Sequence, residues 1–428
     1  MRNWSFAIPL KMTILTYIFY TISSILLFFL IFPFITVVLS FLKKEKTTDI
    51  LRDEIPIQAG LRGGKNSEKF DYANIITAYR NAEIAKPLIQ SLLMQTHQNH
   101  HIYLLADNCD MSDWDIQHEK LTVLSPQPAL NLKVKSIIYA TERLVRQHDY
   151  TVIWDADNLA HPQFLENING FALAGFKAIQ GQRTAKNLDT TVAAADALGE
   201  FYKNYVERQV PPLLGSSSVI SGSGMAIEQN LYESYLYGEE ITKGKELWKK
   251  MMQEDKILQN HIINQGERIV YAKDALCYDE KVSEVADIET QRSRWLFSYF
   301  QNLKNTTGFV LRGLFTFNWN TLLFGLVTVA PPLFILLGLS GLFLLMSLFI
   351  NLKISLAFIL GITVFIGTIF WTLYLSNVPP QVWLAVEAMP LFILKQVKAL
   401  FKMTNPNKNF KHSEHKINVS IDDVLKDK

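Results

Sequence analysis

Residues 150–157 of this 428-residue chain, Tyr-Thr-Val-Ile-Trp-Asp-Ala-Asp, place two carboxylates directly after a short apolar run. The run at residues 150–154 has the length and the aromatic and β-branched composition of a buried strand. Open α/β sheets bind their ligands at the carboxyl ends of the strands. We therefore expect Asp155 and Asp157 to lie at a ligand-binding edge of a sheet.

The same arrangement, an apolar run followed by polar residues, occurs twice before residue 150. Residues 73–77 predict a first strand, residues 82–94 its helix, and residues 101–105 a second strand. Short apolar runs and longer helical stretches alternate as far as about residue 295, which predicts an α/β fold with a mostly parallel sheet. The polar residues that would follow the three strands are Tyr79, Arg80 and Asn81, Asp107 and Asn108, and Asp155 and Asp157.

The composition argues against several classes of function. A formal net charge of +2 and the lack of a basic stripe give no reason to expect a nucleic-acid partner. The two cysteines, Cys109 and Cys277, are too few for a disulfide framework or a four-cysteine metal site, which favours a cytoplasmic middle region. The stretch Gly-Ser-Gly at residues 222–224 lacks the third glycine of a dinucleotide-binding fingerprint, and the sequence contains no phosphate-binding Gly-Lys-Ser/Thr loop.

Two strongly apolar regions flank the middle part. Residues 12–42 contain no charged residue and exceed the roughly 20 apolar residues that a spanning helix needs. A secretory signal is the alternative, but its apolar region would be shorter. More lysines and arginines follow this segment than precede it, which predicts an outward N-terminus and a cytoplasmic middle region. Residues 321–376 predict two further spans with a turn near residues 351–353.

These patterns divide the chain into seven expected segments. Residues 377–403 mix apolar and aromatic residues with lysines, which suits a helix lying in the membrane interface, with a third span as the alternative. The segments are an N-terminal transmembrane helix at residues 1–46, a linker at 47–68, a cytoplasmic domain at 69–300, an interfacial segment at 301–320, two transmembrane helices at 321–376, an interfacial or membrane helix at 377–403, and a flexible cytoplasmic tail at 404–428.

Three motifs carry candidate chemistry. In an extended turn, Asp155 and Asp157 can approach one hard cation and the diphosphate that it carries, although acidic residues after strands also serve as turn or cap residues. Glu-Asp at residues 254–255 lies in an amphipathic helical stretch, where a solvated face is the plainer interpretation. Gln-Arg-Ser-Arg-Trp at residues 291–295 begins another amphipathic segment, where Arg and Trp would be ordinary interfacial anchors.

In their order along the chain, these motifs resemble those of the family 2 glycosyltransferases of GT-A fold, especially the membrane synthases related to cellulose and hyaluronan synthases. That family has an acidic residue after the second strand, an Asp-Xaa-Asp, a Glu-Asp or similar motif, and Gln-Xaa-Xaa-Arg-Trp followed by membrane helices. The counterparts here are Asp107 and residues 155–157, 254–255 and 291–295. The resemblance covers about residues 69–295. It implies an α/β GT-A domain with a mostly parallel sheet, flanked by transmembrane helices.

The resemblance also implies roles for particular residues. Asp255, with Glu254 beside it, would take the proton of the acceptor hydroxyl. A bound Mg²⁺ or Mn²⁺ would neutralise the leaving diphosphate. The donor-binding residues would be Tyr79, Asn81, Asp107, Lys135, Asp155 and Arg294, the metal ligands Asp155 and Asp157, and the acceptor-binding residues Gly222, Ser223, Gly224, Gln291 and Trp295.

The implied function is that of a membrane-bound inverting glycosyltransferase that transfers a sugar from a nucleotide diphosphate donor, first of all a UDP-sugar, to a growing oligo- or polysaccharide. Glycosylation of a lipid acceptor is the alternative with the same chemistry, and a non-catalytic scaffold is disfavoured by the intact acidic set. Ala82 and Gln253 depart from the residues that the family often has there. About three spans are fewer than the larger polymer synthases possess, which puts a self-made translocation channel in doubt. We expect an integral protein of a bacterial inner (plasma) membrane with a cytoplasmic catalytic domain.

Overall fold

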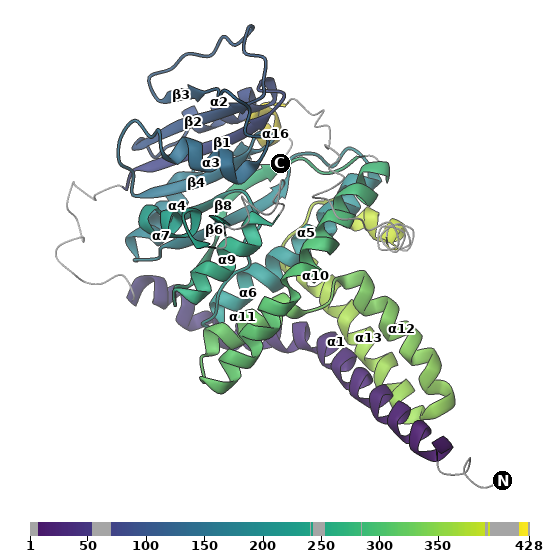
Figure 1. Cartoon of the computed structure of the whole chain (residues 1–428). Helices are drawn as coiled ribbons and strands as arrows, with labels where there is room; N and C mark the ends of the chain where they lie inside the picture. Colours follow the sequence, from purple (N-terminus) through teal and green to yellow (C-terminus); the bar gives the residue numbers. More distant parts are fainter. Residues whose placement is uncertain are drawn as a thin grey trace.

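The computed structural model describes residues 7–53, 70–239, 241–242, 253–283, 285–389, 393 and 419–426. A sheet covered by helices forms one part of the molecule, and a bundle of long helices extends away from it (Figure 1). The first described helix, α1 (Ala7–Asp53), begins at the far tip of this bundle (Figure 1). Most of the expected linker, residues 54–68, lies outside the described residues.

In the described part of the chain the sheet has eight strands in the order β3-β2-β1-β4-β7-β6-β8-β5. Strands β3, β2, β1 and β4 are parallel, as are β6 and β8, whereas β7 is antiparallel to both neighbours and β5 is antiparallel to β8. The expected mostly parallel sheet is confirmed. The strands are β1 (Tyr72–Tyr79), β2 (His100–Asp107), β3 (Leu121–Leu124), β4 (Tyr150–Asp155), β5 (Leu159–Ala160), β6 (Ala178–Ala185), β7 (Met225–Glu228) and β8 (Ile269–Asp279).

Both faces of the central strands are buried, which explains their nearly continuous apolar sequences. Along β1, Ile75 packs into one hydrophobic core with Tyr103, and Ile76 packs into a second core with Trp154. The helices of this domain are η1 (Glu83–Ala85), α2 (Lys86–Leu93), α3 (Lys133–Thr141), α4 (Phe164–Leu173), α5 (Thr191–Lys203), the π-helical η2 (Asn204–Gln209), α6 (Val210–Leu213), α7 (Gln229–Leu236) and α9 (Glu254–Asn264).

The parallel register brings the ends of the three predicted strands together. Tyr79 at the end of β1 pairs with Asp107 at the end of β2, and Thr77 of β1 pairs with Asp155 at the end of β4. Beyond these ends, Arg80 and Asn108 have positive φ angles of 67° and 57°, so the chain turns sharply away from the sheet. The polar residues that follow the strands therefore share one edge, as the sequence predicted.

Within the described residues, three helices are long and apolar enough to cross a membrane: Ile14–Lys43 of α1 (Ala7–Asp53), α12 (Leu333–Ile350) and α13 (Leu352–Leu375). They pack on one another as a three-helix bundle, and a hydrogen bond from Asn351 Nδ2 to the hydroxyl of Tyr20 joins the α12–α13 turn to α1. The predicted turn near residues 351–353 is thus confirmed, with the Asn351 side chain capping α13 by accepting from the Lys353 amide.

The first part of the apolar region at residues 321–376 differs from expectation. It belongs to a separate helix, α11 (Trp319–Val329), which packs against α10 (Val285–Phe315) and buries Phe324 in the core shared with the sheet. Pro331 and Pro332 follow α11 and prevent it from continuing into α12, because proline cannot join an uninterrupted helix. Helix α10 also runs unbroken through the expected boundary at residues 300–301.

The C-terminal segments are described only in part. Helices α14 (Pro380–Leu384) and η3 (Ala385–Ala388) contact α5, whereas residues 390–392 and 394–418 lie outside the described residues, so the choice between an interfacial helix and a third span stays a prediction. Helix α16 (Ile421–Lys426) departs from the flexible tail expected for residues 404–428. It buries Ile421 and Val424 against Leu159 and Tyr278, because its apolar residues recur at helical spacing.

Candidate active site

A cavity of about 1160 Å³ opens at the shared edge of β1, β2 and β4. Its walls come from that edge, the first turns of α3 and α9, the helices α5 and α10, and the facing ends of α12 and α13. Predicted site residues that line it are Tyr79, Asn81, Asp107, Asp155, Asp157, Gly222, Glu254, Asp255, Gln291, Arg294 and Trp295.

Asp107 holds the loop that precedes α3. Its buried carboxylate accepts hydrogen bonds from the amides of Leu130, at 2.8 Å, and Asn131, at 2.6 Å. Asn131 has a positive φ of 54° and accepts a 2.8 Å hydrogen bond from the hydroxyl of Tyr79. The ends of β1 and β2 therefore fix the backbone from which α3 starts.

The first residue of α3, Lys133, lines the cavity between the strand ends and α9. Lys133 Nζ lies 2.6 Å from Asp155 Oδ1, 3.8 Å from Glu254 Oε1 and 3.4 Å from the carbonyl oxygen of Gly222. Burial alone would lower the pKa of the Lys133 ammonium, but the carboxylates of Asp155 and Glu254 outweigh it and raise that pKa. Lys135, which the resemblance suggested, lies two residues along the helix and is not among the described residues that line the cavity.

The two predicted metal ligands differ in their surroundings. The Asp155 side chain is 38% exposed and contacts Lys133, and its amide donates to Asn158 Oδ1. Asp157 is buried, and its carbonyl oxygen accepts a hydrogen bond from Lys186 Nζ. Both aspartates line the cavity and offer only oxygen ligands. Mg²⁺ is commonly held by one or two carboxylates plus substrate phosphates, so this pair fits a divalent cation that arrives with a diphosphate.

The part of the chain that the structure describes contains no group of three or more His, Cys, Asp or Glu side chains able to hold a metal ion by themselves. A cation bound by this pair would take its other oxygen ligands from water or from a bound molecule.

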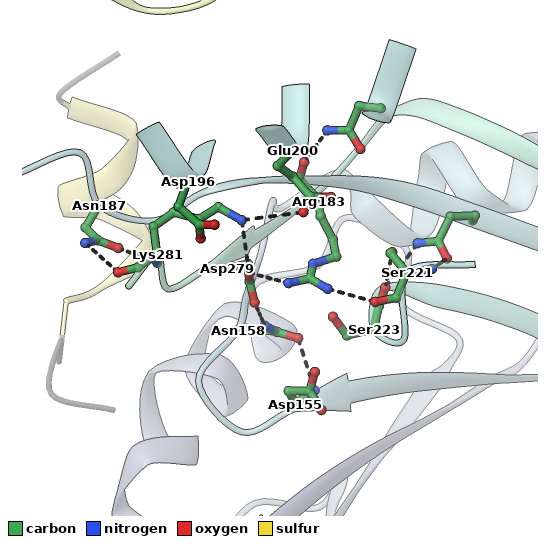
Figure 2. Close-up of polar contacts among 12 residues, drawn as sticks. Asp155, Asn158, Arg183, Asn187, Asp196, Glu200, Ser221, Ser223, Asp279 and Lys281 are labelled. Carbon is green, nitrogen blue, oxygen red and sulfur yellow. Dashed lines mark hydrogen bonds and ion pairs between the residues drawn. The ribbon is translucent and has the colours of Figure 1, made fainter. Parts of the chain in front are cut away.

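A buried ionic network, which the sequence did not reveal, lies near Asp155 (Figure 2). The Asp279 carboxylate contacts Arg183, Lys281 and Asn158, and Glu200 accepts a 2.6 Å hydrogen bond from Arg208. Burial would raise the pKa of Glu200, yet Arg208 and Lys281 lower it below its ordinary value. The network joins β6, β8, α5 and η2 at the floor of the cavity.

Arg183 connects this network to the glycine-containing loop. Its guanidinium donates a 2.7 Å hydrogen bond to the carbonyl oxygen of Ser221, beside Gly222 (Figure 2). Gly222 has φ +91°, a conformation that favours glycine, and a Cβ at this position would lie 3.9 Å from Asp255 Cβ, which places the glycine next to that residue. Ser223 and Gly224 do not line the described cavity: Ser223 is buried, and a Cβ on Gly224 would lie 2.8 Å from Cys277 Cβ.

Helix α9 presents its first two residues, Glu254 and Asp255, to the cavity. The positive end of the helix dipole favours carboxylates at this position. Burial raises the pKa of Glu254, and Asp255 adds to the rise, whereas Lys133 opposes it.

The motif at residues 291–295 lines the cavity from α10. Burial lowers the pKa of the Arg294 guanidinium, which lines the wall. Trp295 is 39% exposed, and the guanidinium carbon of Arg292 and Nζ of Lys203 lie 4.4 Å and 5.5 Å from its ring centroid. Two cationic groups therefore lie near the indole ring in the cavity wall.

Known proteins were compared with the whole chain. No curated protein sequence matches it. The crystal structure of S. aureus TarS 1-349 is similar at 11% identity and a TM-score of 0.37, covering 56% of this chain and 65% of that chain. A mannosyltransferase, PcManGT from Pyrobaculum calidifontis in complex with GDP-Man and Mn²⁺, has 12% identity and a TM-score of 0.47, covering 88% of this chain and 100% of that chain.

The family model described as "Glycosyltransferase like family 2" matches residues 71–298, which is more than half of the 428 residues. The matched region contains all eight described strands and extends into α10, including the motif at residues 291–295. The chain therefore belongs to the family 2-like glycosyltransferases and combines a GT-A domain with three helices that are long and apolar enough to cross a membrane.

Proposed function

We propose that the protein transfers a sugar from a nucleoside diphosphate sugar to an acceptor at the membrane, with inversion at the anomeric carbon. The observation that carries this proposal is the position of Lys133, which lies in one cavity with the Asp155-Xaa-Asp157 turn and the Glu254-Asp255 pair. Such a transfer requires a positively charged side chain that binds the diphosphate, carboxylates that bind a metal ion, and a carboxylate that accepts the acceptor's proton. The resemblance favours UDP as the nucleotide.

The donor would lie along the edge formed by β1, β2 and β4. Tyr79, Asn81 and Asp107 would surround the nucleoside, and Lys133 and Arg294 would contact the diphosphate. The Asp107 carboxylate already accepts hydrogen bonds from two backbone amides. We therefore propose two roles for Asp107: it holds the loop that binds the nucleoside, and it borders the nucleoside. Gln291 and Trp295 would face the acceptor from α10.

Asp255 is the proposed general base. The acceptor oxygen forms a bond to the anomeric carbon, the bond from that carbon to the diphosphate oxygen breaks, and the electron pair leaves with the diphosphate. The acceptor proton passes to the Asp255 carboxylate, which lines the cavity. Attack opposite the leaving group inverts the configuration in a single step.

The proposed metal is Mg²⁺ or Mn²⁺, held by Asp155 and Asp157. When bound, it would supply positive charge that stabilises the diphosphate. In the described structure the Lys133 ammonium group already contacts Asp155. The protein itself therefore supplies one positive charge beside this proposed metal ligand.

Replacing Asp255 tests the proposed chemistry. Purified protein incubated with a panel of nucleotide sugars should release free nucleoside diphosphate as sugar is transferred. In Asp255→Asn, transfer should fall by about 10²–10⁴-fold, the usual contribution of general-base catalysis, while donor binding measured by calorimetry stays close to wild type. Asp274→Asn is the matched control, because Asp274 is exposed and is not among the described residues that line the cavity. Wild-type transfer by Asp255→Asn would remove Asp255 from the mechanism.

Removing the metal ligand tests the second proposal. Mn²⁺ should strengthen the binding of the donor to wild-type protein, because two carboxylates facing a diphosphate repel it without a cation. Asp157→Ala should lose this metal-dependent gain, and chelation should stop turnover of the wild type. Calorimetry that gives the same donor affinity with and without Mn²⁺ in the wild type would contradict the assignment.

We propose that the GT-A domain faces the cytoplasm. The lysines that follow the first span, including Lys43 and Lys44, support this orientation, and the α12–α13 turn with Tyr20 lies at the opposite end of the bundle. Cytosolic nucleotide sugars would then reach the cavity directly.

Cysteine labelling tests this orientation. In protein whose Cys109 and Cys277 are replaced by alanine, a cysteine at Asn351 should react with a membrane-impermeant maleimide in intact cells. A cysteine at the exposed Glu119 should react only after the membrane is permeabilised. The reverse labelling pattern would overturn the proposed orientation.

A further inference from the structure

The cavity has a second part that the transfer of a soluble sugar does not explain. Residues of the three-helix bundle, from α1, α12 and α13, also line it, and we call the part of the cavity that they line the apolar arm. Its described lining from α1, α12 and α13 consists of apolar side chains only, among them Phe32, Leu337, Phe365 and Ile369. The arm and the carboxylates of the transfer site therefore belong to one continuous space.

The apolar arm extends deep along the spans. Phe365 precedes the end of α13 at Leu375 by ten residues, which corresponds to about 15 Å of helix. Phe32 precedes the end of the first span at Lys43 by 11 residues, or about 16 Å. A bilayer core is about 30 Å thick, so the arm reaches roughly the middle of the membrane.

The chemistry of the arm decides between the two classes of acceptor. A passage for a growing polysaccharide needs polar side chains along its wall to replace the water around the hydroxyl groups, and it needs to cross the whole membrane. The arm offers neither in its described lining. An aliphatic chain needs no hydrogen bonds and gains free energy by contact with such a wall.

The junction between the two parts of the cavity is amphipathic. Tyr299 and Trp295 lie there with Arg294, Arg292 and Lys203, a mixture of aromatic and cationic side chains typical of the membrane interface. The headgroup of a lipid whose chain occupies the arm would lie at this junction. Its polar atoms would then face Asp255 across the cavity.

We infer that the acceptor is a membrane lipid with a hydroxyl-bearing headgroup, whose aliphatic chain occupies the apolar arm. This inference rests on the proposed sugar transfer and names its acceptor. The lipid hydroxyl oxygen forms the bond to the anomeric carbon, the diphosphate leaves with the electron pair of the broken bond, and Asp255 receives the hydroxyl proton. A hydroxyl group supplies the proton that the proposed base removes.

The first test measures whether a radiolabelled sugar is transferred to a lipid. Full-length protein is reconstituted in phosphatidylcholine vesicles supplemented with the total lipid extract of the membranes that carry it, and is given radiolabelled nucleotide sugars. The expected product partitions into butanol, as a glycolipid does. Label that stays in water as saccharide while nucleoside diphosphate is released would overturn the lipid inference and leave the proposed transfer intact. No nucleoside diphosphate release from any donor would overturn the proposed function itself.

The second test fills the arm. Ile366 lines the cavity and is 42% exposed, so Ile366→Trp can be accommodated without disrupting the helix packing, yet it narrows the arm. Leu360→Trp is the matched control on the same helix, because Leu360 is 63% exposed and is not among the lining residues. Ile366→Trp should lower lipid glycosylation by about tenfold or more, with donor affinity unchanged and Leu360→Trp close to wild type. Equal glycosylation by the two variants would overturn the inference.

Discussion

The contact of Lys133 with Asp155 and Glu254 is the interaction on which the proposed site depends. It joins the start of α3, the end of β4 and the start of α9, three segments that are far apart in the sequence. An ammonium group is costly to bury unless carboxylates compensate it, and here they raise its pKa instead of allowing burial to lower it. The charge is therefore retained where the diphosphate of a donor would bind.

The rest of the domain holds these three segments in position. Asp107 fixes the loop that leads into α3, and the Arg183–Asp279 contact supports the loop that contains Gly222. Breaking one partner of a buried ion pair is strongly destabilising, because the other charge is left without compensation. The network at the floor of the cavity thus couples the geometry of the site to the stability of β6 and β8. Helix α10 lines the cavity and packs against α11, whereas residues of the bundle line the same cavity.

Much of this arrangement could be predicted from the sequence, because it depends on local patterns. The apolar runs at residues 73–77, 101–105 and 150–154 became β1, β2 and β4, and the parallel register placed their polar ends together. The turn at Asn351 was predictable from polar residues that interrupt a long apolar stretch. The separate helix at residues 319–329 was not anticipated, although Pro331 and Pro332 were a visible signal for it.

Other features depend on contacts that sequence patterns do not encode. Whether Lys133 or Lys135 faces the cavity is set by the residue at which α3 begins, and Leu132 before it provides no capping side chain that would mark this start. Members of the buried network, such as Arg183 and Asp279, are separated by almost a hundred residues. The packing of α16 also depends on residues far away in the sequence, because Ile421 contacts the surface formed by Leu159 and Tyr278. The helical spacing of its apolar residues was only a weak signal for this helix.

The most direct measurement of the central claim is the affinity for the nucleoside diphosphate of the donor, by calorimetry in the presence of Mg²⁺, for Lys133→Met and Lys135→Met. If the diphosphate binds where Lys133 lies, Lys133→Met should weaken binding by about ten- to a hundredfold, as expected for the loss of a hydrogen bond to a charged group. Lys135→Met should bind like the wild type. Equal affinities for the two variants, or a loss confined to Lys135→Met, would contradict the account.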